Sequence, residues 1–564
     1  MSNKAKTGGA LLVECLQAQG VDTAFCVPGE SYLAVLDALY EARDAIRLVV
    51  CRQEGGAANM AEAYGKLTNR PGVCFVTRGP GATNASTGVH TAFQDSTPMV
   101  LFIGQVARRM RHREGFQEVD FSTMFAPLVK WSAEISDPRR IPEYVHRAFQ
   151  VAMAGRPGPV VLALPEDVLS DLIDDPPEPG IAAHPIPAAA REEQIDRLDE
   201  MIAAAARPLI MVGGGGWTQS AGEQLMAYAE RRGVPVAVSL RCQDYVDNDH
   251  PNYVGHFTIG ADPGLLQRLE QADLLVALGP RLGEMTTAGY ALLKPPRIGR
   301  PFAHIHADPE ELGKVYQADL AIAASPAVVA SQLAARIGKT ASAPESWVTE
   351  ARAAYEHTLL PGPLPGAVNL GEVMVTLRET LPPDTIVCSG AGNYTGWVHR
   401  HWRFHGYRTQ LAPTSGAMGY AVPAAIAAKV AFPERAVLSV SGDGCFQMHG
   451  QEIGTAAQYG LKILFIVANN GIYGTIRMHQ EREFPGRVIA TEIVNPDFVA
   501  LAQAYGLFAE RVERTADFAA CLDRALKAPG SALIELVTDP EAITARTTLS
   551  KLRQTALERQ LQSA

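Results

Sequence analysis

Short apolar runs alternate along this chain with longer segments in which apolar residues recur every three or four positions. The short runs are typical of buried strands, and the longer segments are typical of amphipathic helices. Strands that alternate with helices pack as parallel sheets covered by helices on their faces. The pattern therefore predicts an α/β protein built from doubly wound parallel sheets.

Two stretches rich in proline and glycine interrupt this alternation. The first begins at residues 174–180 and continues to about residue 190; the second lies between residues 341 and 369 and includes 360–366. A chain of 564 residues is long enough for about three domains. We predict domains at 1–175, 190–340 and 367–545, followed by a polar, helical tail at 546–564.

A pair of polar motifs follows two neighbouring predicted strands. Gly442, Asp443 and Gly444 follow one strand, and Asn470 follows the apolar run 463–468, 27 positions beyond Asp443. This arrangement resembles the fold motif of thiamine diphosphate (ThDP) enzymes, in which an Asp and an Asn hold a divalent metal on a diphosphate. Each motif alone is also an ordinary turn or loop. Their combination across a strand-helix-strand unit favours the cofactor site.

The chemistry of a bound diphosphate agrees with these residue types. Mg²⁺ takes oxygen ligands in a near-octahedral shell, and the Asp443 carboxylate and the Asn470 amide offer such oxygens. Gly442 and Gly444 let the backbone approach the phosphate closely, and amides at the following helix start can face it. By resemblance, the third protein ligand is the backbone carbonyl of Ile472.

Glu54 stands at the exit of another predicted strand, before the small-residue helix start at 55–58. In the ThDP family, a Glu at this place contacts the aminopyrimidine ring and promotes the imino tautomer that deprotonates the thiazolium carbon. Such a proton transfer needs a carboxyl group with a raised pKa, which burial against the cofactor would provide. The alternative is a Glu that interacts only with the helix dipole. Together with the Asp443 motif, Glu54 is predicted to be catalytic.

Further segments resemble the acetolactate-synthase-like branch of this family, and the resemblance covers most of the chain. In the N-terminal third they are 78–84, 98–106, 115–118 and 155–162. In the C-terminal third, 416–419 is similar to a segment whose Met props the bent cofactor, although a Met in an apolar helix is usually core. The resemblance implies a cofactor site made of Gly392, Asn393, Tyr394, Gly416, Met418, Gly442, Asp443, Gly444, Cys445, Asn470, Ile472, Tyr473 and Gly474.

Three departures from that branch concern the choice of substrate. Glu30 replaces a common Gly and is interpreted as an acid, a base or a substrate-orienting group, or else as a solvated turn residue. Arg78 replaces a Ser and is a partner for a carboxylate or phosphate, or an ion-pair partner of Glu30 or another acid. His479 replaces a characteristic Trp, and we do not assign it a catalytic role. The predicted substrate pocket comprises Glu30, Ser31, Arg78, Phe116, Gln117, Thr475, Ile476 and His479.

The central domain contains four successive glycines, 213–216, after an apolar run. In the resembled family this domain carries FAD, binds a nucleotide or is inert. We favour structural packing of the glycines, because the spacing of a dinucleotide-binding motif is absent. The segment 278–284 also departs from the Arg-Phe-Asp-Asp-Arg-like sequence of acetolactate synthases, which argues against FAD. The missing dinucleotide motif also disfavours a nicotinamide dehydrogenase.

Composition is that of a globular enzyme, with 47% hydrophobic and 20% charged residues. A net charge of −10 disfavours nucleic acid or an anionic membrane as a main partner. No apolar run reaches the roughly 20 residues of a membrane span, and the first residues lack a signal core. We therefore expect a cytoplasmic protein with reduced cysteines. The eight cysteines, without a Cys-x-x-Cys pair, are Cys15, Cys26, Cys51, Cys74, Cys242, Cys388, Cys445 and Cys521.

The resemblance implies a ThDP- and Mg²⁺-dependent enzyme that acts on a 2-oxo acid by decarboxylation and carboligation. The alternatives are a carbon–carbon lyase or hydrolase, or a simple 2-oxo acid decarboxylase. From other classes, an FAD-containing oxidoreductase and a non-catalytic ThDP-binding protein stay open. Glu54 and Asp443 come from different subunits in the family, so we expect a homodimer or homotetramer with the site at the subunit interface.

Overall fold

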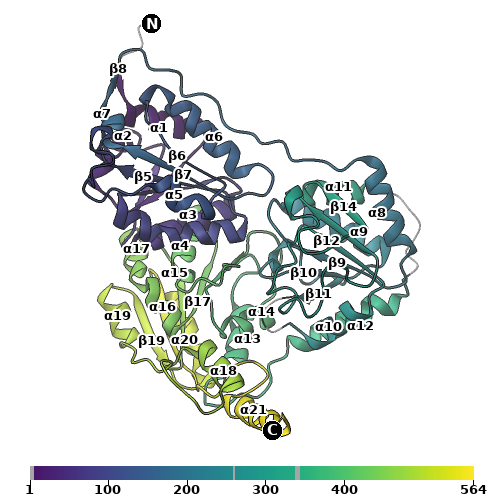
Figure 1. Cartoon of the computed structure of the whole chain (residues 1–564). Helices are drawn as coiled ribbons and strands as arrows, with labels where there is room; N and C mark the ends of the chain where they lie inside the picture. The colour runs from purple at the N-terminus through teal and green to yellow at the C-terminus, as the bar shows by residue number, and fades with distance from the viewer. Residues whose placement is uncertain (1–4, 258, 260, 337–342, 564) are drawn as a thin grey trace. The chain divides into compact units, whose positions relative to one another are not determined.

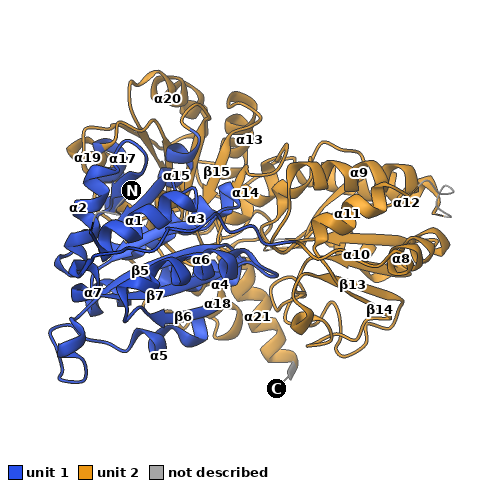
Figure 2. Ribbon diagram, turned by 90° about the horizontal axis from the view of Figure 1, so that it is seen from above, with its two compact units in different colours: residues 1–186, 426–432, 451–458 blue, residues 187–425, 433–450, 459–564 orange. Residues whose placement is uncertain are grey.

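The computed structural model describes residues 5–257, 259, 261–336 and 343–563 (Figure 1). It contains three six-stranded sheets, and every strand pair in them is parallel. The predicted fold class of three doubly wound α/β domains is thereby confirmed. The chain divides into two compact units (Figure 2), and each is described by itself.

The N-terminal unit comprises residues 1–186 together with two short segments, 426–432 and 451–458. Its sheet has the order β3-β2-β4-β5-β7-β6. The strands are β2 (Thr23–Cys26), β3 (Arg47–Val50), β4 (Gly72–Val76), β5 (Met99–Gln105), β6 (Trp131–Glu134) and β7 (Pro159–Pro165), with a small antiparallel pair β1 (Lys6–Thr7) and β8 (Leu172–Ile173). The helices are α1 (Gly8–Ala18), α2 (Leu33–Glu41), α3 (Glu54–Thr68), α4 (Gly79–Asp95), α5 (Phe121–Phe125), α6 (Ile141–Met153) and α7 (Glu166–Ser170).

Helices α3 and α4 pack very closely, and their small residues make this possible. A Cβ atom on Gly88 of α4 would lie only 2.5 Å from the Cβ of Ala58 on α3. Glu54, as expected, begins the helix that follows β3, and the next residues are buried glycines and alanines. The small-residue run thus fixes the position of the helix start that carries Glu54.

The central sheet, in the second unit, has the order β11-β10-β9-β12-β13-β14. Alternate residues of β9 face the hydrophobic clusters on opposite sides of this sheet, with Ile210 in one cluster and Leu209 in the other. Burial on both faces explains why a strand such as β9 reads as an unbroken apolar run. The strands are β9 (Pro208–Val212), β10 (Val236–Val238), β11 (Tyr253–His256), β12 (Leu274–Leu278), β13 (Phe302–His306) and β14 (Leu320–Ala323). The helices are α8 (Glu192–Ala204), α9 (Gln219–Arg232), α10 (Pro263–Gln271), α11 (Pro326–Ala334) and α12 (Glu345–Thr358).

The C-terminal sheet, also in the second unit, has the order β16-β15-β17-β18-β20-β19. Its strands are β15 (Ile386–Ser389), β16 (Gln410–Leu411), β17 (Val437–Gly442), β18 (Leu464–Asn469), β19 (Phe508–Val512) and β20 (Ala532–Val537). The helices that accompany these strands along the chain are α13 (Leu370–Thr380), α14 (Thr395–His401), α15 (Ala421–Ala431), α16 (Asp443–His449), α17 (Ile453–Gln458), α18 (Gly474–Glu483), α19 (Phe498–Ala504), α20 (Thr515–Lys527) and α21 (Leu549–Ser563). Of these, α17 and part of α15 belong to the N-terminal unit.

Counting strands along the chain, the first and third sheets share the order 2-1-3-4-6-5, whereas the central sheet has the Rossmann order 3-2-1-4-5-6. The two outer domains therefore have similar folds, with a Rossmann-like domain between them in the chain. In sheets of both kinds, ligands bind beyond the carboxyl ends of the strands where the order reverses. This rule points to the ends of β15 and β17 in the C-terminal sheet.

The two linkers differ in how well the sequence predicted them. Residues 174–190 contain no helix or strand, as expected. Most of the described part of the second stretch is instead helix α12, whose buried Trp347 donates a hydrogen bond to the carbonyl of Pro208 at 2.8 Å. The proline-rich composition of 360–366 hid this helix, because it lies directly before that segment. The expected tail is helical and forms α21.

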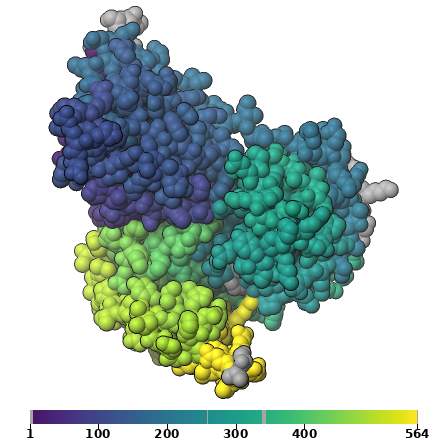
Figure 3. All heavy atoms as spheres, in the orientation of Figure 1, coloured from purple at the N-terminus to yellow at the C-terminus, as the bar shows by residue number. Residues whose placement is uncertain are grey.

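A buried carboxylate fastens α21 to α18. Glu481 of α18 accepts hydrogen bonds from Arg553 of α21 at 2.5 and 2.7 Å, from Arg477 at 3.1 Å and from the amide of Gly486 at 3.0 Å. In the space-filling view, the yellow C-terminal helix lies against the yellow-green residues of its domain (Figure 3). The tail is therefore an integral part of the C-terminal domain.

Glu481→Gln is expected to lower the melting temperature near pH 7. Arg553, the largest influence, holds the pKa of Glu481 at about 2, below its ordinary value of 4.5. The ionised group therefore contributes stability above about pH 4.5, and this contribution is lost as the pH falls toward 2. Calorimetry should show a difference between parent and variant that shrinks over this range. Glu558→Gln, on an exposed position of α21, is the matched control. A difference that stays constant with pH would contradict the assignment.

No helix among the described residues is long and apolar enough to cross a membrane. All eight cysteines are buried and form no disulfide, in agreement with the expectation of reduced core residues.

Candidate functional site

A cavity of about 280 Å³ lies at the carboxyl ends of β15, β17 and β18, where the strand order of the C-terminal sheet reverses. Apolar residues such as Leu364 and Ile543 form part of its wall. All thirteen residues of the expected cofactor site line it, namely Gly392, Asn393, Tyr394, Gly416, Met418, Gly442, Asp443, Gly444, Cys445, Asn470, Ile472, Tyr473 and Gly474. The structure thus brings together four sequence segments that the resemblance had assigned to one site.

Asp443 is the acidic centre of this cavity. One of its oxygens accepts a hydrogen bond from the amide of Gly444 at 2.9 Å; the other accepts from the amide of Gly471 at 2.8 Å and from the side-chain amide of Asn495 at 2.7 Å. Burial raises the pKa of Asp443, and these hydrogen bonds oppose the increase. No Lys or Arg of the described chain forms an ion pair with this carboxylate. Among the hydrogen bonds given above, neutral amides alone hold this carboxylate.

The predicted metal ligands offer a donor set that suits Mg²⁺. The side-chain oxygen of Asn470 accepts from the amide of Ile472 at 3.2 Å, and the carbonyl of Ile472 accepts from the amide of Gly474 at 2.9 Å. Each of these oxygens has a second lone pair for a ligand. With Asp443 they make one carboxylate, one amide and one carbonyl oxygen, the hard donors that Mg²⁺ prefers. The residues present fit such an ion.

Two asparagines that are not among the predicted site residues, Asn469 and Asn495, support this arrangement. Asn495 donates to Asp443 and also to the side-chain oxygen of Asn469 at 2.8 Å. Asn469 in turn donates to Glu535 of β20 at 2.7 Å. Asn469 directly precedes the predicted ligand Asn470, so the same motif could have indicated it. Asn495 lies in an irregular loop and has no signal in the sequence.

Glycines at this site leave room for aromatic rings. A Cβ on Gly442 would lie 2.9 Å from the ring of Tyr394, and one on Gly444 would lie 2.7 Å from the ring of Tyr473. The Tyr394 hydroxyl donates to the sulfur of Cys445 at 3.2 Å, and burial raises the pKa of this hydroxyl. The sequence motif alone explains Gly442 and Gly444 by close approach of the backbone to phosphate. The structure adds that each of them admits a tyrosine ring that joins neighbouring loops.

Met418 lies in a turn before α15 and not in an apolar helix, so the simple explanation as a helix core residue does not hold. Gly416 is exposed with φ +69°, and Gly419 has φ +82°, conformations that favour glycine. The amide of Gly419 donates to the sulfur of Cys445 at 3.2 Å. The turn that carries Met418 is thereby connected to the segment after β17.

The substrate-pocket candidates of the C-terminal domain divide into two groups. Thr475 and Ile476 line the cavity, and Thr475 donates to the side-chain oxygen of Asn393 at 3.0 Å. Ile476 is about half exposed, at 54%. His479, one turn further along α18, is exposed and is not among the residues that line the cavity.

Glu54 is half-buried at the start of α3 in the N-terminal unit. The side-chain amide of Asn84, on α4, donates to its carboxylate at 2.9 Å. The preceding residue, Gln53, caps the helix by accepting from the amide of Gly56 at 3.0 Å. The contact with Asn84 joins two segments of the resemblance that the sequence alone left unconnected.

Arg78 is buried between two carboxylates at the carboxyl end of its sheet. Its guanidinium binds Glu30 at 2.8 Å and Glu166 at 2.7 Å, and its side chain is only 7% exposed. This is the ion-pair alternative of the sequence analysis, with Glu166 as a second acid that the sequence did not indicate. Glu30 is 65% exposed, so its carboxylate reaches solvent while Arg78 holds it in place.

The other candidates of the N-terminal unit have mainly structural contacts. Ser31 is fully buried and shares a hydrogen bond of 2.9 Å with Thr77. Gln117 has φ +64°, and its carbonyl accepts from the amide of Gly79 at 3.0 Å. Phe116 is 70% exposed. Among these three, Phe116 alone presents a large surface that a substrate or another chain can contact.

The glycine run of the central domain packs tightly against the loop that follows β12. A Cβ on Gly214 would lie 2.0 Å from the carbonyl oxygen of Gly279, which follows β12. Trp217 donates to the carbonyl of Gly213 at 2.8 Å, and the Tyr245 hydroxyl donates to that of Gly214 at 2.6 Å. These contacts favour the interpretation that the glycines allow two loops to meet.

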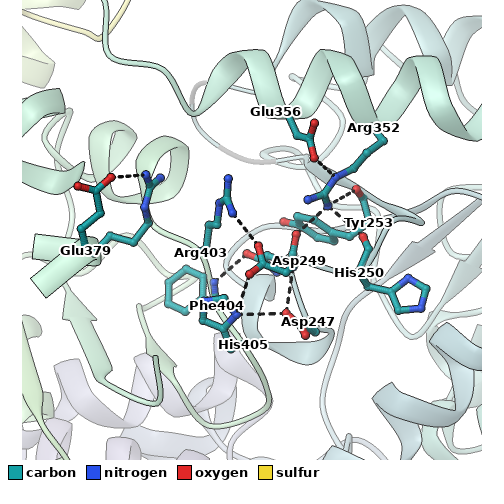
Figure 4. A network of polar contacts seen from close by, with 12 residues as sticks. Asp247, Asp249, His250, Tyr253, Arg352, Glu356, Glu379, Arg403, Phe404 and His405 are labelled. Carbon is teal, nitrogen blue, oxygen red and sulfur yellow. Dashed lines mark hydrogen bonds and ion pairs between the residues drawn. The ribbon is translucent and has the colours of Figure 1, made fainter. Parts of the chain in front are cut away.

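A separate acidic cluster lies where the central domain meets residues 403–405 (Figure 4). The ring of His405 contacts Asp247 at 3.3 Å and Asp249 at 3.5 Å. Arg403 forms an ion pair with Asp249 at 2.9 Å. A cation is thus already present at these carboxylates, and we interpret the cluster as a polar connection between the two domains of the second unit.

Comparison with known proteins places the chain in a family. Family models of thiamine pyrophosphate enzymes match three parts of it: the N-terminal TPP binding domain at residues 6–124, the central domain at 195–333 and the C-terminal TPP binding domain at 390–536. The three matches correspond to the three sheets described above. Thiamine pyrophosphate and ThDP are the same compound.

Relatives of known name extend this agreement over nearly the whole chain. The acetolactate synthase large subunit of Corynebacterium glutamicum is 34% identical, over 92% of this chain and 84% of the relative. A probable acetolactate synthase large subunit of Methanocaldococcus jannaschii is 31% identical, over 94% and 92%. The mitochondrial acetolactate synthase catalytic subunit of Saccharomyces cerevisiae is 30% identical, over 94% and 81%. The chain therefore belongs to the ThDP-dependent enzymes, in their acetolactate-synthase-like branch.

Proposed function

We propose that this enzyme uses ThDP and Mg²⁺ to decarboxylate a 2-oxo acid and to join the remaining fragment to a second carbonyl compound. The observation that carries the proposal is the cavity around Asp443, in which all thirteen expected cofactor residues meet. The names of the relatives support a 2-oxo acid as donor. A cytoplasmic location stays a prediction from the sequence.

The cavity residues have distinct roles in this proposal. Asp443, Asn470 and the carbonyl of Ile472 would hold Mg²⁺ on the diphosphate. Gly416 and Met418 would support the middle of the cofactor, as the resemblance implies. When bound, ThDP supplies a carbon nucleophile and a cationic ring that accepts electrons from the bond that breaks.

Glu54 would move a proton to and from the aminopyrimidine ring, and Asn84 orients its carboxylate. The hydrogen bond from a side-chain amide fixes the orientation of a carboxylate. General acid–base catalysis requires such a fixed position, because the carboxylate must lie within hydrogen-bond distance of the group with which it exchanges a proton. Thr475 and Ile476 would line the space beside the reacting carbon. The packing of the central glycines gives no support to FAD, and we do not include FAD in the proposal.

A simple decarboxylase is the second candidate, and one observation favours it. Glu30 is an exposed carboxylate held by Arg78, in a position where acetolactate synthases commonly have Gly. A carboxylate beside the substrate would hold water there, and a proton from that water would favour protonation of the reacting carbon over its reaction with a second carbonyl compound. Lyase and hydrolase reactions at a carbon–carbon bond use the same cofactor and stay as further alternatives.

Product analysis distinguishes these reactions. The purified enzyme with ThDP and Mg²⁺ is incubated with a panel of 2-oxo acids, each alone and each with a set of aldehydes or a second 2-oxo acid. We expect carbon dioxide and a 2-hydroxy ketone product from at least one pair. Carbon dioxide with only the free aldehyde would identify a decarboxylase. Bond cleavage without carbon dioxide would identify a lyase or hydrolase.

Two inactive variants are expected to restore activity when mixed. In the family, Glu54 and Asp443 of one site come from different subunits, so a mixed dimer of Glu54→Gln and Asp443→Ala chains contains one site with both native residues. Subunit exchange should therefore recover up to roughly a quarter of the parent activity, if exchange is random and every chain pairs equally. Sedimentation should show at least a dimer. A fully active monomer would contradict this assembly.

A further inference from the structure

A segment from the C-terminal part of the chain supports the helix start that carries Glu54. Residues 451–458 belong to the N-terminal unit. There, the Glu452 side chain is fully buried, and one of its oxygens accepts hydrogen bonds from the backbone amides of Arg52 at 2.9 Å and Gln53 at 3.0 Å. These two residues lie between β3 and α3, directly before Glu54. The contact joins positions 400 residues apart.

Hydrogen-bond direction defines the role of Glu452 as an acceptor. The guanidinium of Arg52 donates to the Thr455 hydroxyl at 3.1 Å and to the carbonyl of Gly454 at 2.9 Å. The Thr455 hydroxyl, which accepts from Arg52, donates its own proton to the second oxygen of Glu452 at 2.5 Å. Three groups thus donate hydrogen bonds to the Glu452 carboxylate: the backbone amides of Arg52 and Gln53 and the hydroxyl of Thr455.

The turn before Glu54 is therefore held from two sides. The Gln53 amide donates to Glu452, and the Gln53 side chain caps the amide of Gly56. A Cβ on Gly56 would lie only 2.6 Å from the Glu452 oxygen, so carboxylate and helix are in close contact. A shift of Glu452 would move the backbone to which the Glu54 side chain is attached.

We propose that Glu452 is a positioning residue for Glu54: by accepting the Arg52 and Gln53 amides, it sets the direction in which the catalytic carboxylate leaves the helix start. This inference rests on the proposed function. The role is one of geometry, because the backbone amides need an acceptor at a given distance. It does not depend on the charge of Glu452.

Two substitutions separate geometry from charge. Glu452→Gln is neutral but keeps an oxygen at the same reach, so both amides stay paired. Glu452→Asp keeps the charge but is one methylene shorter, so the amides lose their acceptor. Gln458→Ala, at an exposed position of α17, the helix that begins directly after Glu452, is the matched control. Thermal unfolding and ThDP affinity are measured for every variant to confirm intact folding and binding.

The first measurement is amide hydrogen exchange of residues 49–56 in the protein without cofactor, followed by mass spectrometry. We expect faster exchange in the Asp variant, and parent-like exchange in the Gln and control variants. The second is proton–deuterium exchange at the thiazolium carbon of bound ThDP. There, the Asp variant should be slower by roughly 10-fold or more, because misplacement of a catalytic group by about 1 Å is costly. The Gln variant should match the parent.

The opposite pattern, a slow Gln variant and a parent-like Asp variant, would overturn the inference in favour of a charge effect. Parent-like behaviour of both variants would overturn any positioning role. These outcomes leave the proposed function intact as long as Glu54→Gln is slow. If Glu54→Gln exchanges as fast as the parent, the proposed role of Glu54 fails instead, so the two failures are distinguishable.

Discussion

Glu54→Gln is expected to slow proton exchange at the thiazolium carbon of bound ThDP by about 10²–10⁴-fold, or roughly 3–5 kcal/mol of barrier. Gln has the shape of Glu and keeps an oxygen that can accept the hydrogen bond from Asn84, but it has no titratable proton. ThDP affinity should therefore change little. Quenched NMR of the released cofactor measures the exchange without knowledge of the substrate.

Asn84→Ala is the matched control for this experiment. It removes the hydrogen bond to Glu54 but leaves the carboxyl group, so a smaller decrease in exchange rate is expected. Equal rates in the parent and the Glu54→Gln variant would leave Glu54 with only the structural role of a residue at the helix start. In that case another group must move the proton.

Asp443→Ala is expected to weaken ThDP binding in the presence of Mg²⁺ by more than about 100-fold. Loss of a residue that only supports a metal ligand typically costs about 10–100-fold in metal affinity, and loss of the charged ligand itself should cost more. The change also removes the carboxylate that Gly471 and Asn495 contact. Calorimetric titration with ThDP and Mg²⁺ measures the affinity.

Asn495→Ala tests the supporting contact in the same titration. The native Asn495 amide donates to one Asp443 oxygen at 2.7 Å, so its removal should weaken ThDP binding in the presence of Mg²⁺ by about 10–100-fold. ThDP affinity of the Asp443→Ala variant equal to that of the parent would contradict the metal assignment. In the absence of Mg²⁺ the parent and both variants should bind ThDP similarly weakly.

Much of the fold could be predicted from the sequence, because most of its strands are buried and read as short apolar runs. The run at 463–468 became β18, and the run before Glu54 became β3. Helix α12 was missed because its polar residues resemble those of a linker, whereas Trp347 and Tyr355 are buried against the central domain. Long-range packing decides the structure there, and local composition does not show it.

The candidate cofactor site could be predicted where short motifs follow strands. Asp443 and Asn470 are such positions, because the ends of neighbouring parallel strands meet at one edge of the sheet. Asn495 and Glu166 were not predicted, because each belongs to no motif and contacts a partner that is distant along the sequence. For Arg78 the sequence left several partners open, and the structure pairs it with Glu30 and Glu166.

The contact between Glu452 and the start of α3 also has a consequence for synthesis of the chain. The amides of Arg52 and Gln53 emerge from the ribosome about 400 residues before their acceptor. At about 5–20 residues per second, this interval lasts roughly 20–80 s. During that time the nascent N-terminal sheet lacks the segments 426–432 and 451–458 of its compact unit. The helix start that carries Glu54 can therefore reach its final geometry only late in translation, and chaperones have a long interval in which to bind it.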